Sequence, residues 1–296
     1  MVKMNKLDIS AVFTVENVKK DSDGKCSYCY RYDSNRNRFV IGAFDGCASV
    51  KYEKLFGKSG AYIASRAVAG ASLNWFGKSC DVSKFREYTD ASLERCVSVC
   101  GKADDGDALC FETSASVITG SFGNELEIYA VWAGNSACFL LKPDGLYRLT
   151  ADDMSYFSND ADVTNVISSE ASYELHTRKI NIKSPCILIC ACAGCFEGLE
   201  SPADFEYLIV DSLIKANGIF GWKEYLRENI SKAAKDDCTM TVAAFGYEDY
   251  DSLSTPFIKR YEYLESKFAS EGADRMKFLE EYKADYCKYT DKATGK

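Results

Sequence analysis

The stretch FVIGAFDGCASV, residues 39–50, predicts a buried strand that ends directly at Asp45 and Gly46. Two other corners are similar: Asp236 and Asp237 directly precede the apolar run CTMTVAAFG, and Asp23 lies in a polar turn between two short apolar runs. Carboxylates at strand ends can meet at one rim of a sheet, and Mg²⁺ and Mn²⁺ prefer oxygen ligands. The three corners together therefore predict a metal site, although any one of them alone is better explained as a turn former.

Strand-like runs occur in groups, and segments of helical spacing occur between those groups. This order is typical of an α+β fold, in which helices pack outside antiparallel sheets, and not of alternating βαβ units. We predict a domain over residues 1–250 and a C-terminal helical extension over residues 251–296 that packs on or beside it. The expected strand runs are residues 10–14, 26–32, 39–44, 114–122, 126–134, 137–149, 186–193 and 238–246, and the expected helices are residues 60–76, 82–99, 202–216 and 222–233. The Pro-Asp-Gly segment within residues 137–149 suits the turn of a hairpin. Residues 151–180 carry no clear pattern.

Composition narrows the classes of partner. A net charge of -8 disfavours nucleic acid, because binding to its backbone depends on clustered Lys and Arg. No apolar run approaches the roughly 20 residues of a membrane span. The polar N-terminal residues lack the pattern of a signal peptide, so we expect a cytoplasmic protein with no membrane partner. The 14 cysteines are then expected to be reduced and mostly buried. With His176 as the only histidine, carboxylates must carry the chemistry.

The order of the acidic corners and their flanking strands resembles the bacterial branch of the metal-dependent type 2C Ser/Thr protein phosphatases. The resemblance spans about residues 10–247 and rests on six pieces in register, each of them loose when taken alone. They are VKKDSDGK at residues 18–25, FVIGAFDGCASV, FETSASVITG at residues 111–120, LEIYAVWAGNSACFLL followed by LYRLTADD at residues 126–153, CILICACAGCFEGL at residues 186–199, and KDDCTMTVAAFG at residues 235–246.

The resemblance implies an antiparallel β-sandwich flanked by helices, in α-β-β-α layers, and in-line hydrolysis of phosphoserine or phosphothreonine in a protein or peptide. It implies that a water bridging two Mg²⁺ or Mn²⁺ ions attacks phosphorus. Carried over by position, Asp45 would bridge the two ions and the Gly46 carbonyl would bind one of them. Asp23 and Asp236 would complete the metal site. Lys19 or Lys20 would receive the substrate phosphate, where the family commonly has arginine.

The sequence departs from the family pattern at four positions. The strand at residues 186–193 should end in Asp-Gly, but the Asp position holds Ala193, whose methyl group cannot bind a metal. The His that often follows the first Asp-Gly is Cys47, so the acid for the leaving group would be a thiol or a water. The family's Gly-Asp-Ser turn holds Asn135, and the phosphate-binding residue is a lysine. These departures leave open a non-catalytic pseudophosphatase that acts as a binding or regulatory protein.

Two cysteine-based alternatives follow from the sequence. The pairs Cys26 with Cys29 and Cys192 with Cys195 have the C-x-x-C spacing of zinc sites. Both pairs lie in or at the end of strand-like runs, where residues three apart point to opposite faces, and this disfavours a shared four-thiolate site. Cys47 could act as a nucleophile only if its pKa were lowered. The expected aspartate neighbours would raise that pKa, so a packing role or the acid position is favoured.

Overall fold

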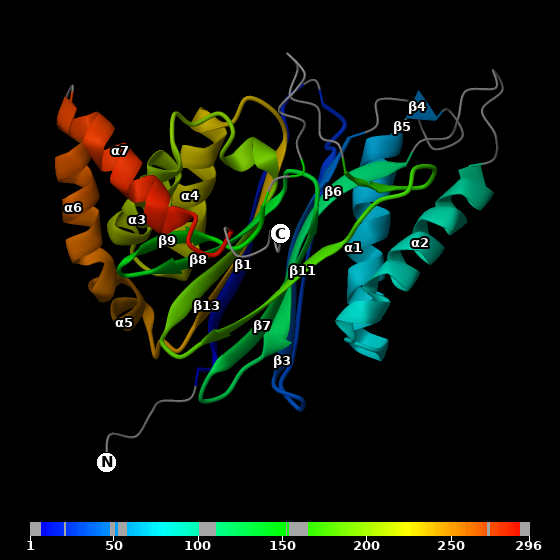
Figure 1. Ribbon diagram of the computed structural model, residues 1–296, viewed down its shortest axis with the longest axis horizontal. Coiled ribbons are helices and arrows are strands. Elements are labelled where there is room, and N and C mark those ends of the chain that lie inside the picture. Colours follow the sequence, from blue (N-terminus) through cyan, green and yellow to red (C-terminus); the bar gives the residue numbers. More distant parts are fainter. Residues whose placement is uncertain are drawn as a thin grey trace.

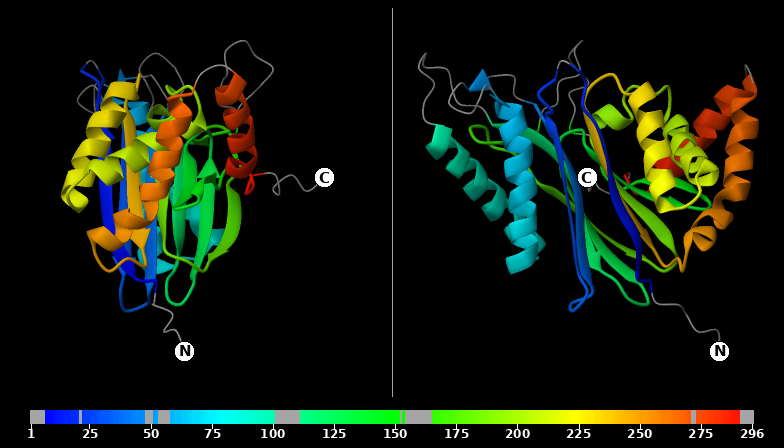
Figure 2. Two further views of the ribbon diagram at one scale, coloured as in Figure 1. Left: turned by 90° about the vertical axis from the view of Figure 1, so that its left-hand side faces the viewer. Right: turned by 180° about the vertical axis from the view of Figure 1, so that it is seen from behind.

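The computed structural model has two antiparallel β-sheets packed face to face, with helices covering both outer faces (Figure 1). The helices α1 and α2 cover one sheet, and the helices α3 to α7 gather on the other side (Figures 1 and 2). The structure describes residues 7–20, 22–47, 51–52, 58–100, 111–151, 153, 165–270 and 273–290. The predicted α+β class and the α-β-β-α layering are confirmed.

The first sheet contains five strands in the order β1-β13-β12-β8-β9. These strands are β1 Ile9–Asn17, β8 Ala137–Lys142, β9 Gly145–Arg148, β12 Cys186–Ala191 and β13 Cys238–Phe245. Strands β8 and β9 form a hairpin in which Lys142 pairs with Gly145, so Pro143 and Asp144 make the two-residue turn that the Pro-Asp-Gly sequence predicted.

The second sheet has the order β11-β7-β6-β3-β2, and β10 pairs with β6. Its strands are β2 Cys26–Asp33, β3 Arg38–Gly46, β6 Glu112–Ser121, β7 Leu126–Ala133, β10 Ile167–Ser168 and β11 His176–Ile182. A separate short pair is formed by β4 Lys51–Tyr52 and β5 Lys58–Ser59. Strands β10 and β11 lie in the region where the sequence showed no pattern.

The helices follow the predicted ranges closely and differ at their ends. The helices and 3-10 turns are α1 Gly60–Lys78, η2 Val82–Lys84, α2 Phe85–Cys100, η3 Ala193–Cys195, α3 Pro202–Lys215, α4 Ile219–Ala233, α5 Tyr250–Ser254, η4 Thr255–Phe257, α6 Ile258–Phe268 and α7 Ala273–Tyr286. Helix α1 begins after Ser59, whose side chain accepts a bond from the amide of Tyr62. Helix α3 begins after Ser201 in the same way, with Pro202 in its first turn.

Three apolar layers hold the sandwich together. Strand β3 shows why its sequence is continuously apolar: Phe39, Ile41 and Ala43 pack between the sheets, whereas Val40 and Phe44 pack under α1 and α2. The third layer joins the first sheet to α3, α4 and the C-terminal helices. Because side chains alternate along a strand, Asp45 continues the series that faces the other sheet, at the rim where β3 ends.

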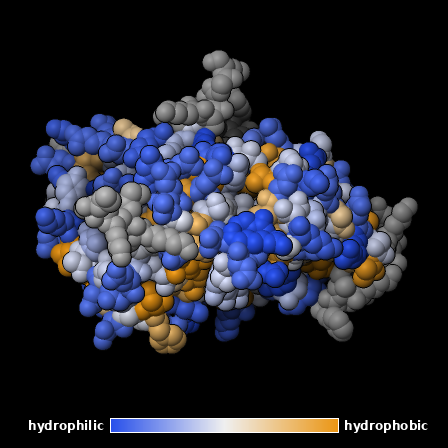
Figure 3. Space-filling view, turned by 90° about the horizontal axis from the view of Figure 1, so that it is seen from below, coloured by the Kyte–Doolittle hydropathy of each residue, from blue (hydrophilic) through white to orange (hydrophobic). Residues whose placement is uncertain are grey.

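The C-terminal segment packs against the rest of the chain. Phe257, Leu264, Phe278 and Tyr282 are buried in the same apolar layer as Trp222 of α4. The predicted domain boundary near residue 250 stays a prediction. Among the described residues, no helix is both long and apolar enough to cross a bilayer, and the cytoplasmic location also stays a prediction. On the end that faces downward in Figure 1, coloured apolar atoms form small separate areas among hydrophilic ones (Figure 3).

Candidate metal centre

Asp45 lies at the rim where β3 ends and β13 begins, the upper rim in Figure 1. Its pKa is raised to about 7, and burial is the main cause. The carboxylates of Asp236 and Glu197 raise it further, whereas the Cys26 thiol and the Lys25 ammonium act in the opposite direction. A carboxylate whose charge is disfavoured by burial and by two like charges is suited to a divalent cation. Asp45 is therefore a candidate ligand for a cation.

The two adjacent aspartates before β13 differ in burial and in their hydrogen bonds. Asp236 is exposed and lies near enough to Asp45 to act on its pKa. Asp237 is buried and accepts bonds from the amides of Lys19 at 2.7 Å and Lys25 at 3.0 Å, and from the hydroxyl of Ser22. The carboxylate of Asp237 therefore holds the loop between β1 and β2.

Replacing Asp237 with alanine should lower the free energy of unfolding by about 2 kcal/mol or more, because two partly buried amides and a hydroxyl lose their acceptor. Asp236→Ala is the matched control, since its side chain is exposed and accepts only the amide of Asp237 at 2.8 Å among the bonds seen in the described residues. Urea unfolding of both variants is the measurement. Equal stability of the two would show that Asp237 does not organise the loop.

Asp23 lies beside the start of α1. Its carboxylate accepts a 2.9 Å bond from the amide of Ser59, and its carbonyl lies 3.4 Å from the Lys58 ammonium. Burial acts to raise the pKa of Asp23, but the bonds from Ser59 and the charge of Lys58 outweigh burial and lower it. The ligand role of Asp23 stays a prediction. In this structure its carboxylate binds the amide of Ser59, the residue that caps the N-terminus of α1.

Gly46 occupies the place where α1 meets the end of β3. A Cβ atom at this position would lie 2.2 Å from the carbonyl oxygen of Ala61, so no larger residue fits without moving the helix. The amide of Gly46 donates a 3.3 Å bond to the carbonyl of Lys25. The structure thus explains the glycine by close approach, and metal binding by the Gly46 carbonyl stays a prediction.

The three lysines near the β1–β2 loop are placed differently. The backbone of Lys19 is fixed by Asp237, and Lys20 is exposed. Among the charges that act most strongly on Asp45, the basic one belongs to Lys25, which sequence reasoning did not select. Its position directly before Cys26, the cross-strand partner of Asp45, is the signal that could have found it.

Cys47 follows Asp45 and Gly46 on the exposed side of the rim. Its thiol donates to the carbonyl of Asp45 at 3.4 Å. The pKa of Cys47 is raised to about 12 by desolvation in the surrounding protein, with a further contribution from the carboxylate of Asp45. Part of the side chain reaches solvent, yet the thiolate is disfavoured, so a nucleophilic role is not supported.

Ala193 begins the turn η3 directly after β12, and it is buried. The turn lies against the acidic corner before β13, because a Cβ on Gly194 would be 2.4 Å from the carbonyl of Asp237. Position 193 is therefore at the same rim as Asp45, and it supplies a methyl group where the family has a carboxylate.

Glu197 is an acidic neighbour of Asp45 that sequence reasoning did not select. Its carboxylate accepts a 3.0 Å bond from the side-chain amide of Asn135, which belongs to the turn between β7 and β8. The turn after Ala193 brings Glu197 to the rim, and such a position is not visible in the spacing of the sequence alone.

The cysteine pairs do not form the four-thiolate site considered above. Cys26 lies in the layer between the sheets and Cys29 in the layer under α1, as the alternation of a strand requires. The second pair begins directly after the end of β12, and Cys192 and Cys195 span a turn in which the Cys195 amide donates to the Cys192 carbonyl at 3.0 Å. The sulfur atoms of Cys26 and Cys192 and a carboxylate oxygen of Asp45 lie within 4.8 Å of one another.

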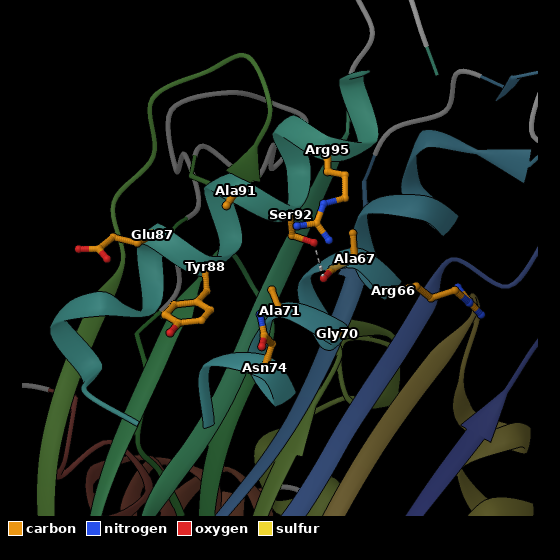
Figure 4. Close-up of a pocket in the computed structure, with 10 residues that line it drawn as sticks. All are labelled: Arg66, Ala67, Gly70, Ala71, Asn74, Glu87, Tyr88, Ala91, Ser92 and Arg95. Carbon is orange, nitrogen blue, oxygen red and sulfur yellow. Dashed lines mark hydrogen bonds between the residues drawn. The ribbon is translucent and has the colours of Figure 1, made fainter. Parts of the chain in front are cut away.

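A hollow of about 640 Å³ lies elsewhere, between α1 and α2 (Figure 4). Arg66 and Arg95 are at its edge, and a bond from Ser92 to the Ala67 carbonyl spans the two helices at 3.0 Å. The guanidinium of Arg66 points away from the hollow and donates to the carbonyl of Gly24 at 2.9 Å. This hollow is separate from the acidic rim.

The sandwich, with its acidic rim, has the fold of the bacterial type 2C Ser/Thr phosphatases. The chain is similar to the S. agalactiae serine/threonine phosphatase, with 14% identity and a TM-score of 0.59 over 79% of this chain and 98% of that one. It is also similar to RsbX in complex with magnesium, with 14% identity and a TM-score of 0.54 over 81% of this chain and 100% of that one. It is similar as well to the catalytic domain of the serine/threonine protein phosphatase PstP in complex with two manganese ions. The identity is 15% and the TM-score is 0.55, over 81% of this chain and 98% of that one. No protein-family model matches the sequence, and no curated protein is similar enough to count as a relative.

Proposed function

We propose that this protein is a metal-dependent phosphatase that hydrolyses phosphoserine or phosphothreonine in proteins. The observation that supports the proposal is the rim of a sandwich with the phosphatase fold, where Asp236 and Glu197 are near enough to Asp45 for their charges to raise its pKa. Solved structures of that fold hold magnesium or two manganese ions. Mn²⁺ or Mg²⁺ is therefore the cofactor class that we propose for this chain.

The residues at the rim divide the work as follows. Asp45 and Asp236 hold the cation, and Glu197 adds a third negative charge beside them. When bound, the metal supplies a Lewis acid and lowers the pKa of a water molecule. Lys25 lies on the same rim and attracts the phosphate of the substrate, with Lys19 and Lys20 as the residues predicted from the sequence. Cys47 occupies the position of the leaving-group acid, but its raised pKa makes its thiol a weak proton donor, so a water molecule is the favoured acid.

Binding of a second ion is weakened in this chain because the side chain of Ala193 has no oxygen atom that could act as a ligand. The same observation favours the second candidate function, a non-catalytic protein that binds phosphoproteins. In that case Lys25 would help to bind the phosphate of a phosphoprotein, and the rim would not catalyse its hydrolysis.

Phosphate release from a phosphothreonine peptide with added Mn²⁺ separates the two functions. Restoring the carboxylate with Ala193→Asp should raise the rate at least about 100-fold, since a preorganised electrostatic group is typically worth that much. Asp45→Asn should reduce the rate to the blank. Asp33→Asn is the matched control. Asp33 lies at the end of the β2–β3 pair opposite to Asp45, so this substitution should not change the rate. If Ala193→Asp and the unmodified chain both equal the Asp45→Asn blank, the phosphatase proposal fails and the binding protein is favoured.

A further inference from the structure

Three potential ligands converge on the inner side of the rim. Cys26 and Asp45 are directly opposite each other on β2 and β3, and the Cys26 thiol donates to the Asp45 carboxylate at 3.2 Å. Cys192 follows β12 of the other sheet, and its amide donates to the carbonyl of Thr239 at 2.9 Å. All three side chains come from rigid strands or from the residue directly after one. Their ligand atoms lie within 4.8 Å of one another.

The donor types select the metal. Thiolates favour Zn²⁺ and other soft or borderline ions, whereas Mg²⁺ requires oxygen ligands in nearly ideal octahedral geometry. Two sulfurs and one carboxylate match the three-ligand pattern of zinc sites that keep a fourth position open. The family position that would supply an oxygen is Ala193, which is adjacent to Cys192. The loss of a hard ligand and the presence of two soft donors therefore occur at the same place.

The spacing is close to what zinc requires. Zn–S bonds of about 2.3 Å and Zn–O bonds of about 2.1 Å at tetrahedral angles separate sulfur from oxygen by roughly 3.6 Å and sulfur from sulfur by roughly 3.8 Å. The observed separation of 3.2 Å between Cys26 and Asp45, and the 4.8 Å limit for the whole group, differ from these values by about 1 Å or less.

We propose that Cys26, Cys192 and Asp45 bind one Zn²⁺ ion at the rim. This site shares only Asp45 with the proposed phosphatase centre, and zinc binding there is a separate property that requires no hydrolysis. Binding replaces two thiol protons, so in a buffer alkaline enough to ionise Asp45 each Zn²⁺ releases two H⁺ and forms two Zn–S bonds and one Zn–O bond. Because Cys26 belongs to one sheet and Cys192 to the other, the ion would link the two sheets and raise the unfolding temperature.

Cobalt titration of the reduced, metal-free full chain tests the site. Co²⁺ should bind at one equivalent and produce a thiolate-to-cobalt charge-transfer band, which equimolar Zn²⁺ removes and a large excess of Mg²⁺ does not. Cys26→Ala and Cys192→Ala should each weaken binding at least about 100-fold, because changes to outer-shell partners alone cost roughly 10- to 100-fold. The matched control is Cys29→Ala, a buried cysteine of the same strand that faces away, and it should bind normally.

Absence of the band in the unmodified reduced chain overturns the proposal, and so does a band that survives in both cysteine variants. If a variant does not fold, the unmodified chain still decides: Zn²⁺ must raise its unfolding temperature and release two protons per ion. Phosphate release is measured separately with Mn²⁺. Zinc binding supports this site, and if neither the unmodified chain nor Ala193→Asp releases phosphate the phosphatase proposal fails. Phosphate release without the thiolate band supports the phosphatase and overturns the zinc site.

Discussion

Replacing Gly46 with alanine should destabilise the protein by about 3 kcal/mol or more, the upper end of what overpacking usually costs. The added Cβ would lie 2.2 Å from the oxygen, 2.5 Å from the carbonyl carbon and 2.6 Å from the Cα of Ala61. All three are backbone atoms at the start of α1, so the clash cannot be relieved by rotating a side chain. The helix or the end of β3 must move, and both are packed in the layer that contains Phe44 and Ala64. Urea unfolding measures the loss.

The control for this prediction is Gly70→Ala. Gly70 is an exposed residue inside α1, and no atom lies within 4 Å of the Cβ that alanine would add. Alanine is favoured over glycine in a helix interior by roughly 0.5–1 kcal/mol, so this variant should be slightly more stable. If both variants have the stability of the unmodified protein, the close approach of α1 to β3 is wrong.

Glu206→Ala should cost about 3–5 kcal/mol, because it breaks a buried ion pair and leaves one partner alone. Glu206 of α3 is fully buried and receives both Nε of Arg260 at 2.6 Å and a second guanidinium nitrogen at 2.8 Å. The hydroxyl of Tyr282 donates to the same carboxylate at 2.7 Å. Burial and the charge of Glu206 raise the pKa of Tyr282, so its hydroxyl stays a donor. One carboxylate thus joins α3, α6 and α7.

Loss of this carboxylate should release the C-terminal helices before the sandwich unfolds. Thermal unfolding combined with limited proteolysis over residues 258–290 checks both effects. Glu228→Ala is the control: its ion pair with Lys232 has a length of 2.7 Å but is exposed, so its loss should leave the unfolding midpoint essentially unchanged. If protease cuts the C-terminal helices equally slowly in both variants, Glu206 does not hold them.

The layered fold was largely predictable from the chain itself. Strand β3 is an unbroken apolar run because both of its faces are buried, and the amphipathic α1 begins at a serine cap. Local turn chemistry also predicted the hairpin at Pro143 and Asp144. By contrast, β10 and β11 were not predicted, because β10 has two residues and β11 carries the polar and charged sequence HTRKINI.

The sequence by itself determined the α+β class and the acidic corners, because these depend on local alternation and on residue identity, whereas the sandwich and the expected carboxylate at position 193 were implied by the family resemblance. Only the tertiary structure decided which acidic residues meet. In the structure, Glu197 and Asp236 are near enough to Asp45 to raise its pKa. The carboxylate of Asp23 accepts a bond from the amide of Ser59, and the carboxylate of Asp237 accepts one from the amide of Lys19 in the β1–β2 loop. It also brought Cys192 to Cys26 across two sheets. The reason is that the inner faces of two packed sheets bring together residues more than 160 positions apart, and no local pattern encodes that distance.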